Sequence, residues 1–154
     1  MPSIARLIRK NLKKKGLINP GELVNQLRSQ YPTQTPAEIA EACGIKLSYE
    51  KLPLAFGKMI YFAEVFFQPP KITVNLTAVA KLAEGVSQVP EEQRKWLTQE
   101  AITNVVIAHE LYHILTQQPS GKAVEAAAHD FAQQLTRLSF SPLVYETILK
   151  KLTT

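Results

Sequence analysis

The residues best suited to chemistry in this 154-residue chain lie in one short window. The chain contains three histidines, and all of them fall between positions 109 and 129. His109 and His113 are four residues apart, so on a helix they share one face, about one turn apart. Glu110 follows the first histidine and can reach a water molecule at a metal without being a ligand itself. This H-E-x-x-H spacing predicts a Zn²⁺ site in which Glu110 is the catalytic base.

A catalytic zinc ion also needs a third protein ligand and one open position. A third histidine six residues after His113 would continue a longer motif, but that position is Pro119. Glu125 and His129 are four residues apart and can share a face of the next helix. We expect Glu125 to be the third ligand, since two histidines and a carboxylate form a known catalytic set. His129 would then support the ligands or face the substrate, and a site of three histidines is the alternative.

Hydrolysis of a peptide bond further needs a donor for the oxygen that gains negative charge. The candidates for this role near the substrate are Tyr112 inside the motif, Tyr61 further upstream and His129. Each of them could instead support the metal ligands from behind. The residue types alone do not choose among them.

These side chains require helices and a sheet to position them. Pro90 and the two acids after it are typical of a helix start, and apolar residues then recur on several sides. We predict one long central helix from Pro90 that ends before Pro119, followed by a turn at 119–121. Two further helices are predicted over about 122–138 and 142–152.

The upstream half combines short helices with strands. Asn19 caps one helix, and Thr35 with Glu38 forms a capping box for the next. Three segments have the alternation or the β-branched and aromatic content of strands. Their short connections predict a small, mostly antiparallel sheet of three or four strands. A substrate strand could pair with its edge at 72–75. The predicted strand segments are 45–50, 58–67 and 71–75.

The sequence therefore predicts one α+β domain over 1–154, in which the sheet packs on helices around a central, zincin-like H-E-x-x-H helix. We expect 33–154 to form this core and 1–32 to be a basic helical extension. Six of the 18 Lys and Arg residues lie within the first 15 positions, and the remainder, with 13 acids, is close to neutral. An amphipathic helix over 3–15 is predicted. Its basic face is either simply solvated or binds nucleic acid, a membrane surface or an acidic partner.

Several other classes of function are disfavoured. No apolar run is long enough to span a membrane, and the N-terminus is a poor signal peptide, so we expect a cytoplasmic protein. The single cysteine, Cys43, excludes an internal disulfide. Residues 37–45 are similar to the first helix and turn of a helix-turn-helix. The strand pattern that follows replaces the base-reading helix, which disfavours direct binding of nucleic acid.

The motif and the segment after it resemble one family, the ImmA/IrrE-type zinc metallopeptidases, which resemble a minimal gluzincin. The resemblance covers about residues 33 to 138, including the predicted helix and strands upstream of the motif. The chain departs from the family pattern at His129, where the family has Asn or Asp. The residues that carry the resemblance are His109-Glu110-Leu111-Tyr112-His113-Ile114-Leu115 and Glu125-x-x-Ala128-His129-x-Phe131-Ala132-x-x-Leu135.

The resemblance implies that His109, His113 and Glu125 bind zinc and that Glu110 is the base. It also implies a protein substrate, a helix-turn-helix repressor that is cleaved to release stress-response or mobile-element genes. The predicted function is therefore a zinc-dependent endopeptidase with a regulatory role. The alternatives are a non-catalytic, zinc-stabilised binding module and a DNA-binding protein that uses residues 36–50 and the basic N-terminal helix.

Overall fold

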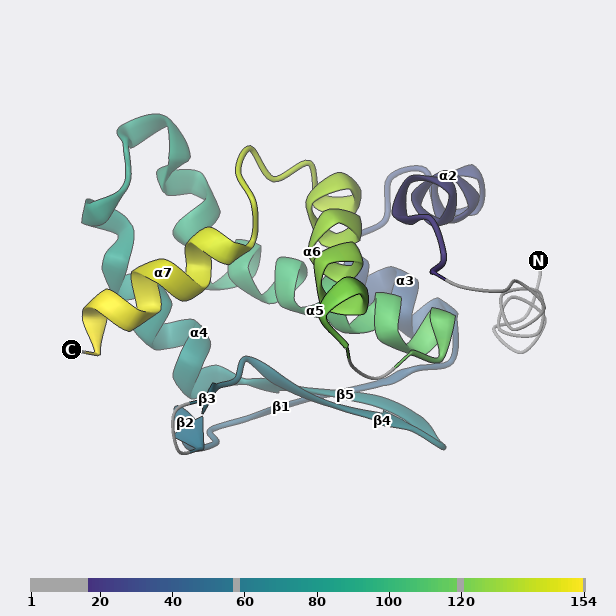
Figure 1. Ribbon diagram of the computed structural model, residues 1–154, viewed down its shortest axis with the longest axis horizontal. Coiled ribbons are helices and arrows are strands. Elements are labelled where there is room, and N and C mark those ends of the chain that lie inside the picture. The colour runs from purple at the N-terminus through teal and green to yellow at the C-terminus, as the bar shows by residue number, and fades with distance from the viewer. Residues whose placement is uncertain (1–16, 57–58, 119–120, 154) are drawn as a thin grey trace.

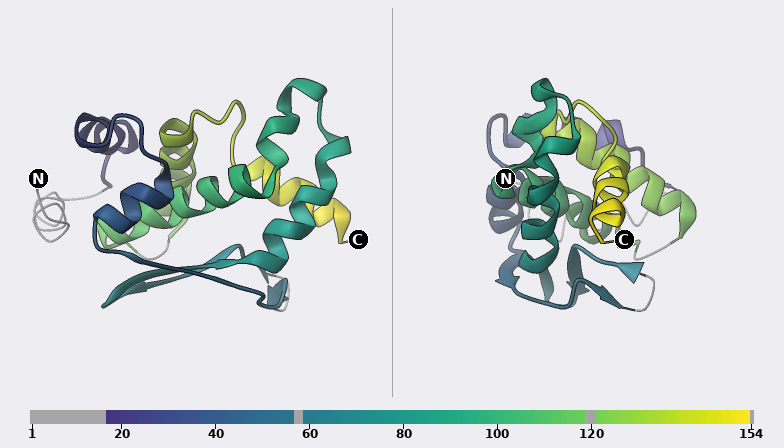
Figure 2. Two further views of the ribbon diagram at one scale, coloured as in Figure 1. Left: turned by 180° about the vertical axis from the view of Figure 1, so that it is seen from behind. Right: turned by 90° about the vertical axis from the view of Figure 1, so that its left-hand side faces the viewer.

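The computed structural model describes residues 17–56, 59–118 and 121–153, so the helix predicted over 3–15 lies outside the described residues. The described chain has an α+β fold in which helices form a layer on one side of a small sheet (Figure 1). Views from two further directions show the same arrangement (Figure 2). The elements in chain order are α2 (Pro20–Gln30), α3 (Pro36–Ala42), β1 (Lys46–Glu50), β2 (Ala55–Phe56), β3 (Met59–Ile60), β4 (Ala63–Phe67), β5 (Pro70–Asn75), α4 (Leu76–Ala83), the 3-10 helices η1 (Glu84–Gln88) and η2 (Glu91–Leu97), α5 (Gln99–Thr116), α6 (Lys122–Thr136) and α7 (Leu143–Leu152).

The sheet has three strands in the order β1-β5-β4. β4 and β5 are antiparallel, but β1 and β5 run parallel, so the prediction of a mostly antiparallel sheet is wrong for this pair. The prediction relied on short connections between neighbouring strands. The chain instead passes through β2, β3 and β4 between the two partners, which allows a parallel pair. β5 is thus the central strand, and the edge predicted at 72–75 for a substrate strand is wrong.

The helix that carries the motif is shorter than predicted. The chain forms η2, becomes extended at Thr98 and only then begins α5. The Thr98 side chain accepts a hydrogen bond from the Ala101 backbone N–H, which satisfies a donor at the helix start. The prediction of a single long helix from Pro90 is therefore wrong, because the Thr98 cap starts a new helix, α5, after η2 has ended. α5 then packs against α3, α4, α6 and the strands β4 and β5.

The N-terminal elements begin where their capping residues predict. Asn19 caps α2, and Thr35 and Glu38 form the predicted capping box of α3. α2 packs against α6, and Ile18 and Leu23 are buried in the common core. The described part of the segment predicted as an extension is thus packed into the same core.

A strand follows α3, as the alternating pattern predicted. In a helix-turn-helix this position belongs to the helix that reads DNA. The described residues 36–50 therefore lack the element that the DNA-binding alternative requires. Separately, none of the described helices combines the length and the apolar character needed to cross a bilayer.

A buried asparagine at the end of β5 joins the sheet to the loop after β1 and to the loop before β4. The Asn75 side chain accepts hydrogen bonds from the backbone N–H of Leu52 and Thr77. It donates to the carbonyls of Pro53 and Tyr61, so each of its polar atoms has partners. We expect Asn75→Ala to lower the free energy of unfolding by about 3 kcal/mol, because buried donors and acceptors lose their partner.

Urea denaturation measures this effect, and Asn25→Ala is the matched control. Asn25 is exposed on α2, where we expect a change within about 0.5 kcal/mol. A loss for Asn75→Ala no larger than that of the control would contradict the assigned role.

Candidate metal centre

Two histidines of α5 and one glutamate of α6 converge on a common point. The Nε2 atoms of His109 and His113 are 3.3 Å apart. One carboxylate oxygen of Glu125 lies 3.0 Å from His109 Nε2, and the other lies 3.0 Å from His113 Nε2. Ligand atoms at the zinc distance of about 2.0–2.1 Å in a tetrahedron are separated by about 3.3 Å. The three side chains could therefore hold a metal ion.

The end of α5 orients His113. Gln117 adopts a left-handed backbone conformation, with φ of 55°, and ends the helix. This turn places the carbonyl of Gln118 at 2.6 Å from His113 Nδ1. Because a carbonyl oxygen can only accept, Nδ1 donates the hydrogen bond and Nε2 faces Glu125. Metal-binding histidines are commonly fixed in this way by the second ring nitrogen.

The electrostatics of the three side chains favour a positive charge between them. Hydrogen bonds from His109 and His113 hold the pKa of Glu125 well below its ordinary range. Burial by itself would lower the pKa of His113, but Glu125, the Gln118 carbonyl and Glu110 together raise it. The Glu125 carboxylate therefore stays ionised, and it lies beside two imidazoles. This is the electrostatic setting that a metal cation requires.

Glu110 lies in the wall beside these ligands. Its side chain is only 15% exposed, and its Oε1 atom is 3.9 Å from His109 Nε2. Burial raises the pKa of Glu110, although His109 and His113 partly oppose this shift. A raised pKa brings a carboxylate closer to the range in which it can both accept and return a proton near neutral pH.

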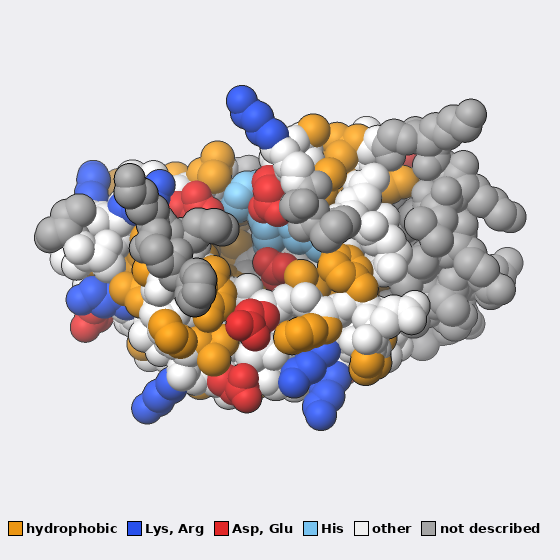
Figure 3. All heavy atoms as spheres, turned by 60° about the horizontal axis from the view of Figure 1, so that its bottom comes forward, with side chains coloured by type: hydrophobic (Ala, Val, Ile, Leu, Met, Phe, Trp, Pro, Cys, Tyr) orange, Lys and Arg blue, Asp and Glu red, His pale blue; other side chains and the backbone are white. Residues whose placement is uncertain are grey.

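A cleft of about 310 Å³ opens over the site. Figure 3 shows the histidines in a hollow with acidic side chains around them. The walls come from the segment 60–63 before β4, from α5 and α6, and from the start of α7. Sequence reasoning missed the contribution of α7, because no spacing rule relates Tyr145 and Glu146 to the motif. The lining outside the ligands and Glu110 consists of Ile60, Tyr61, Phe62, Ala63, Val105, Val106, His129, Pro142, Tyr145 and Glu146.

Two of the three further candidates face this cleft. Tyr61 is part of its wall, and His129 packs its ring 4.5 Å from the ring of His109, centroid to centroid. Burial, and to a lesser extent His109, lowers the pKa of His129 to about 4, so its imidazole is neutral near pH 7. Within the described part of the chain its buried Nδ1 has no hydrogen-bond partner.

Tyr112 lies away from the cleft. Its side chain is fully buried, its ring packs on Phe131, and its hydroxyl donates to the Ile18 carbonyl at 2.6 Å. The role predicted for Tyr112 at the substrate is therefore wrong, because this side chain joins α5 to the segment before α2. Its ring lies edge-on to that of His113, 6.4 Å away between centroids, so support of this ligand from behind stays a prediction.

Comparison of the chain with protein-family models, with curated proteins and with solved structures finds no match in any of the three. The case for a function rests on the site itself. That site combines a possible cation position, a buried carboxylate and a cleft of a size that accepts a ligand.

Proposed function

We propose that this protein is a zinc-dependent endopeptidase. The observation that carries the proposal is the convergence of His109, His113 and Glu125 beside Glu110 in an accessible cleft. Two imidazoles and a carboxylate form a catalytic zinc set that leaves one position open. Membership of the ImmA/IrrE type, with a zincin-like core, belongs to the same proposal and is supported by the motif and the segment after it.

Three polar residues of the cleft besides the ligands have a part in the proposed peptide hydrolysis. A zinc ion held there would supply the Lewis acidity that polarises the scissile carbonyl and activates the attacking water. Glu110 accepts a proton from that water and delivers it to the nitrogen of the leaving amine. His129 and Tyr61 face the cleft, where either can donate a hydrogen bond to the carbonyl oxygen as it gains charge.

The substrate is a polypeptide that enters in an extended conformation. β4 is an outer strand of the sheet, and the segment 60–63 that leads into it lines the cleft. Pairing with the outer side of β4 would hold a substrate strand through its backbone and leave its side chains to give specificity. The family resemblance extends the proposal to a helix-turn-helix repressor as the natural substrate.

The test uses the full-length protein loaded with zinc. We expect metal analysis to find one bound zinc ion per chain, and we expect mass spectrometry to find defined cuts in a peptide library and in a helix-turn-helix repressor. Bound zinc without cleavage of any polypeptide would overturn the proposal in favour of the non-catalytic module. Failure to bind zinc would overturn both the peptidase proposal and the non-catalytic zinc module.

The charge of the cleft predicts which side chains the substrate carries. Glu110, Glu125 and Glu146 line it, and its described lining includes neither lysine nor arginine. A divalent zinc ion would compensate two of these three charges, and Glu146 has no ion-pair partner in the described structure. We expect a basic residue near the scissile bond, and we expect Glu146→Lys to reduce the preference for it about tenfold in kcat/KM, since near-surface charge pairs contribute about 1–4 kcal/mol.

Cleavage of the same peptide library by wild type and variant measures this preference. Glu50→Lys makes the same change at an exposed position of β1, outside the cleft, and should leave the preference unaltered. Equal cleavage at basic and acidic sites by the wild type would contradict the predicted preference and leave the peptidase proposal standing.

A further inference from the structure

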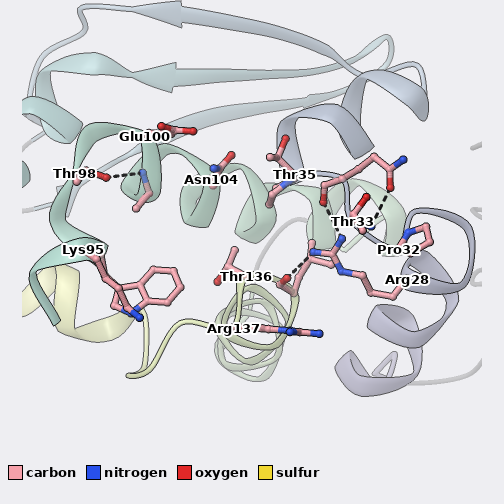
Figure 4. A pocket seen from close by; sticks show the side chains of 15 residues that line it. Arg28, Pro32, Thr33, Thr35, Lys95, Thr98, Glu100, Asn104, Thr136 and Arg137 are labelled. Carbon is pink, nitrogen blue, oxygen red and sulfur yellow. Dashed lines mark hydrogen bonds between the residues drawn. The ribbon is translucent and has the colours of Figure 1, made fainter. Parts of the chain in front are cut away.

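A second and larger cavity, of about 650 Å³, lies on a different face of α5. It is open to solvent and is bordered by Arg28 of α2, by the loop 32–36, by η2, by the first turns of α5 and by the end of α6 (Figure 4). α5 contributes Ala101 and Asn104 to this cavity but His109 and His113 to the metal centre. The two cavities share no lining residue, so a ligand in one leaves the other open.

The lining of this cavity carries an excess of positive charge. Its cationic side chains are Arg28, Lys95 and Arg137, and its acidic side chain is Glu100. None of the three cations forms a salt bridge within the described residues. In Figure 4, Arg28 and Arg137 lie toward one end of the cavity and Lys95 toward the other. The cavity therefore presents a positive field that an anion would neutralise.

Arg28 is held rigidly in the wall. Its guanidinium donates to the carbonyls of Tyr31, Gln34 and Leu135 at 3.0, 2.8 and 2.8 Å. These contacts join α2, the loop after it and α6, and they use three of about five available N–H groups. Because carbonyls carry no net charge, the positive charge of Arg28 is not compensated by these contacts. Two of its N–H groups make none of these hydrogen bonds and can donate to a ligand.

A second guanidinium, that of Arg137, lines the same cavity. Arg137 follows α6 in a left-handed backbone conformation, with φ of 61°. Its side chain is exposed, and it lines the same cavity as Arg28, toward the same end (Figure 4). Burial, and then the charge of Arg137, lowers the pKa of Arg28. Paired guanidinium groups of this kind suit the oxygens of a phosphate, which accept several charge-assisted hydrogen bonds.

Trp96 adds an apolar surface. Its indole ring is partly exposed and lines the cavity, whereas its Nε1–H is buried beneath that surface. The Lys95 ammonium lies 5.6 Å from the centre of the Trp96 ring, which places a further cation beside this surface.

We propose that this cavity binds a small organic phosphate of nucleotide size. The lining carries a formal charge of about +2, which matches a phosphate monoester better than a single carboxylate. A volume of about 650 Å³ is within the range of small-molecule sites and far exceeds the needs of inorganic phosphate alone. The phosphate binds the two guanidinium groups, and the organic part extends toward Trp96 and Lys95.

The position of the only tryptophan in the chain permits a direct test. Adenosine monophosphate, adenosine, inorganic phosphate and an acidic peptide are titrated at constant ionic strength into the full-length protein, with Trp96 fluorescence and calorimetry as readouts. We expect saturable binding of adenosine monophosphate, weaker binding of phosphate that competes with it, and no binding of adenosine. Arg137→Gln should weaken binding of the monophosphate about tenfold, the effect of losing one charged hydrogen-bond donor.

Lys150→Gln is the matched control, because Lys150 is exposed on α7 and its loss changes the net charge by the same amount. The proposal is overturned if the monophosphate does not bind in either readout, or if adenosine binds as well. It is also overturned if the acidic peptide binds more tightly, or if both variants weaken binding equally. None of these outcomes depends on zinc or on peptidase activity.

Discussion

Purified Glu110→Gln protein is expected to bind zinc as the wild type does and to cleave polypeptides about 100- to 10,000-fold more slowly, the usual contribution of a general base. Glutamine has the shape of glutamate but cannot accept a proton from water. The ligands His109, His113 and Glu125 are left in place, so metal binding should survive. Initial cleavage rates of one peptide, together with the zinc content of each preparation, measure both parts of this expectation.

The control for this prediction makes the same chemical change outside the cleft. Glu91 is exposed in η2 and lines neither cavity, so Glu91→Gln should cleave at the wild-type rate. If Glu110→Gln cleaved as fast as this control while retaining zinc, Glu110 would not be the base. If it lost zinc, the residue would instead support the ligands.

Glu125→Ala is expected to weaken zinc binding by more than about 100-fold, because the loss of groups that only support ligands already costs about 10- to 100-fold. The variant should also lose the stabilisation that zinc confers, about 2.7 kcal/mol when free zinc is 100 times the dissociation constant. Competition with a chromophoric chelator measures the affinity. Calorimetric melting with and without zinc measures the stabilisation.

His129 provides the comparison that separates the two possible ligand sets. It lies one turn beyond Glu125 on α6, and its ring packs against His109. We expect His129→Asn to retain zinc, since the ligand atoms that converge belong to the other three residues. Zinc loss in His129→Asn with retention in Glu125→Ala would establish the three-histidine site in its place.

Much of the local structure could be predicted because it depends on residues within about one helical turn of each other. The caps at Asn19 and Thr35 each satisfy a backbone donor three residues away, and both helices start where the caps predict. The helix bounds predicted after residue 121 agree with α6 and α7 to within two residues. The new helix start at Thr98, which the prediction missed, also depends on neighbouring residues. The Thr98 hydroxyl, which lies just before a sequence of good helix formers, could have indicated it.

Helical periodicity is enough to place His109 and His113 on one helix face, with Glu110 beside them, and Glu125 and His129 on another. That Glu125 points at both imidazoles could not be read from the residue order. The reason is that the rotation of α6 against α5 depends on packing across the whole interface. The same kind of long-range packing turned Tyr112 into the core, made β5 the central strand and brought Glu146 into the cleft.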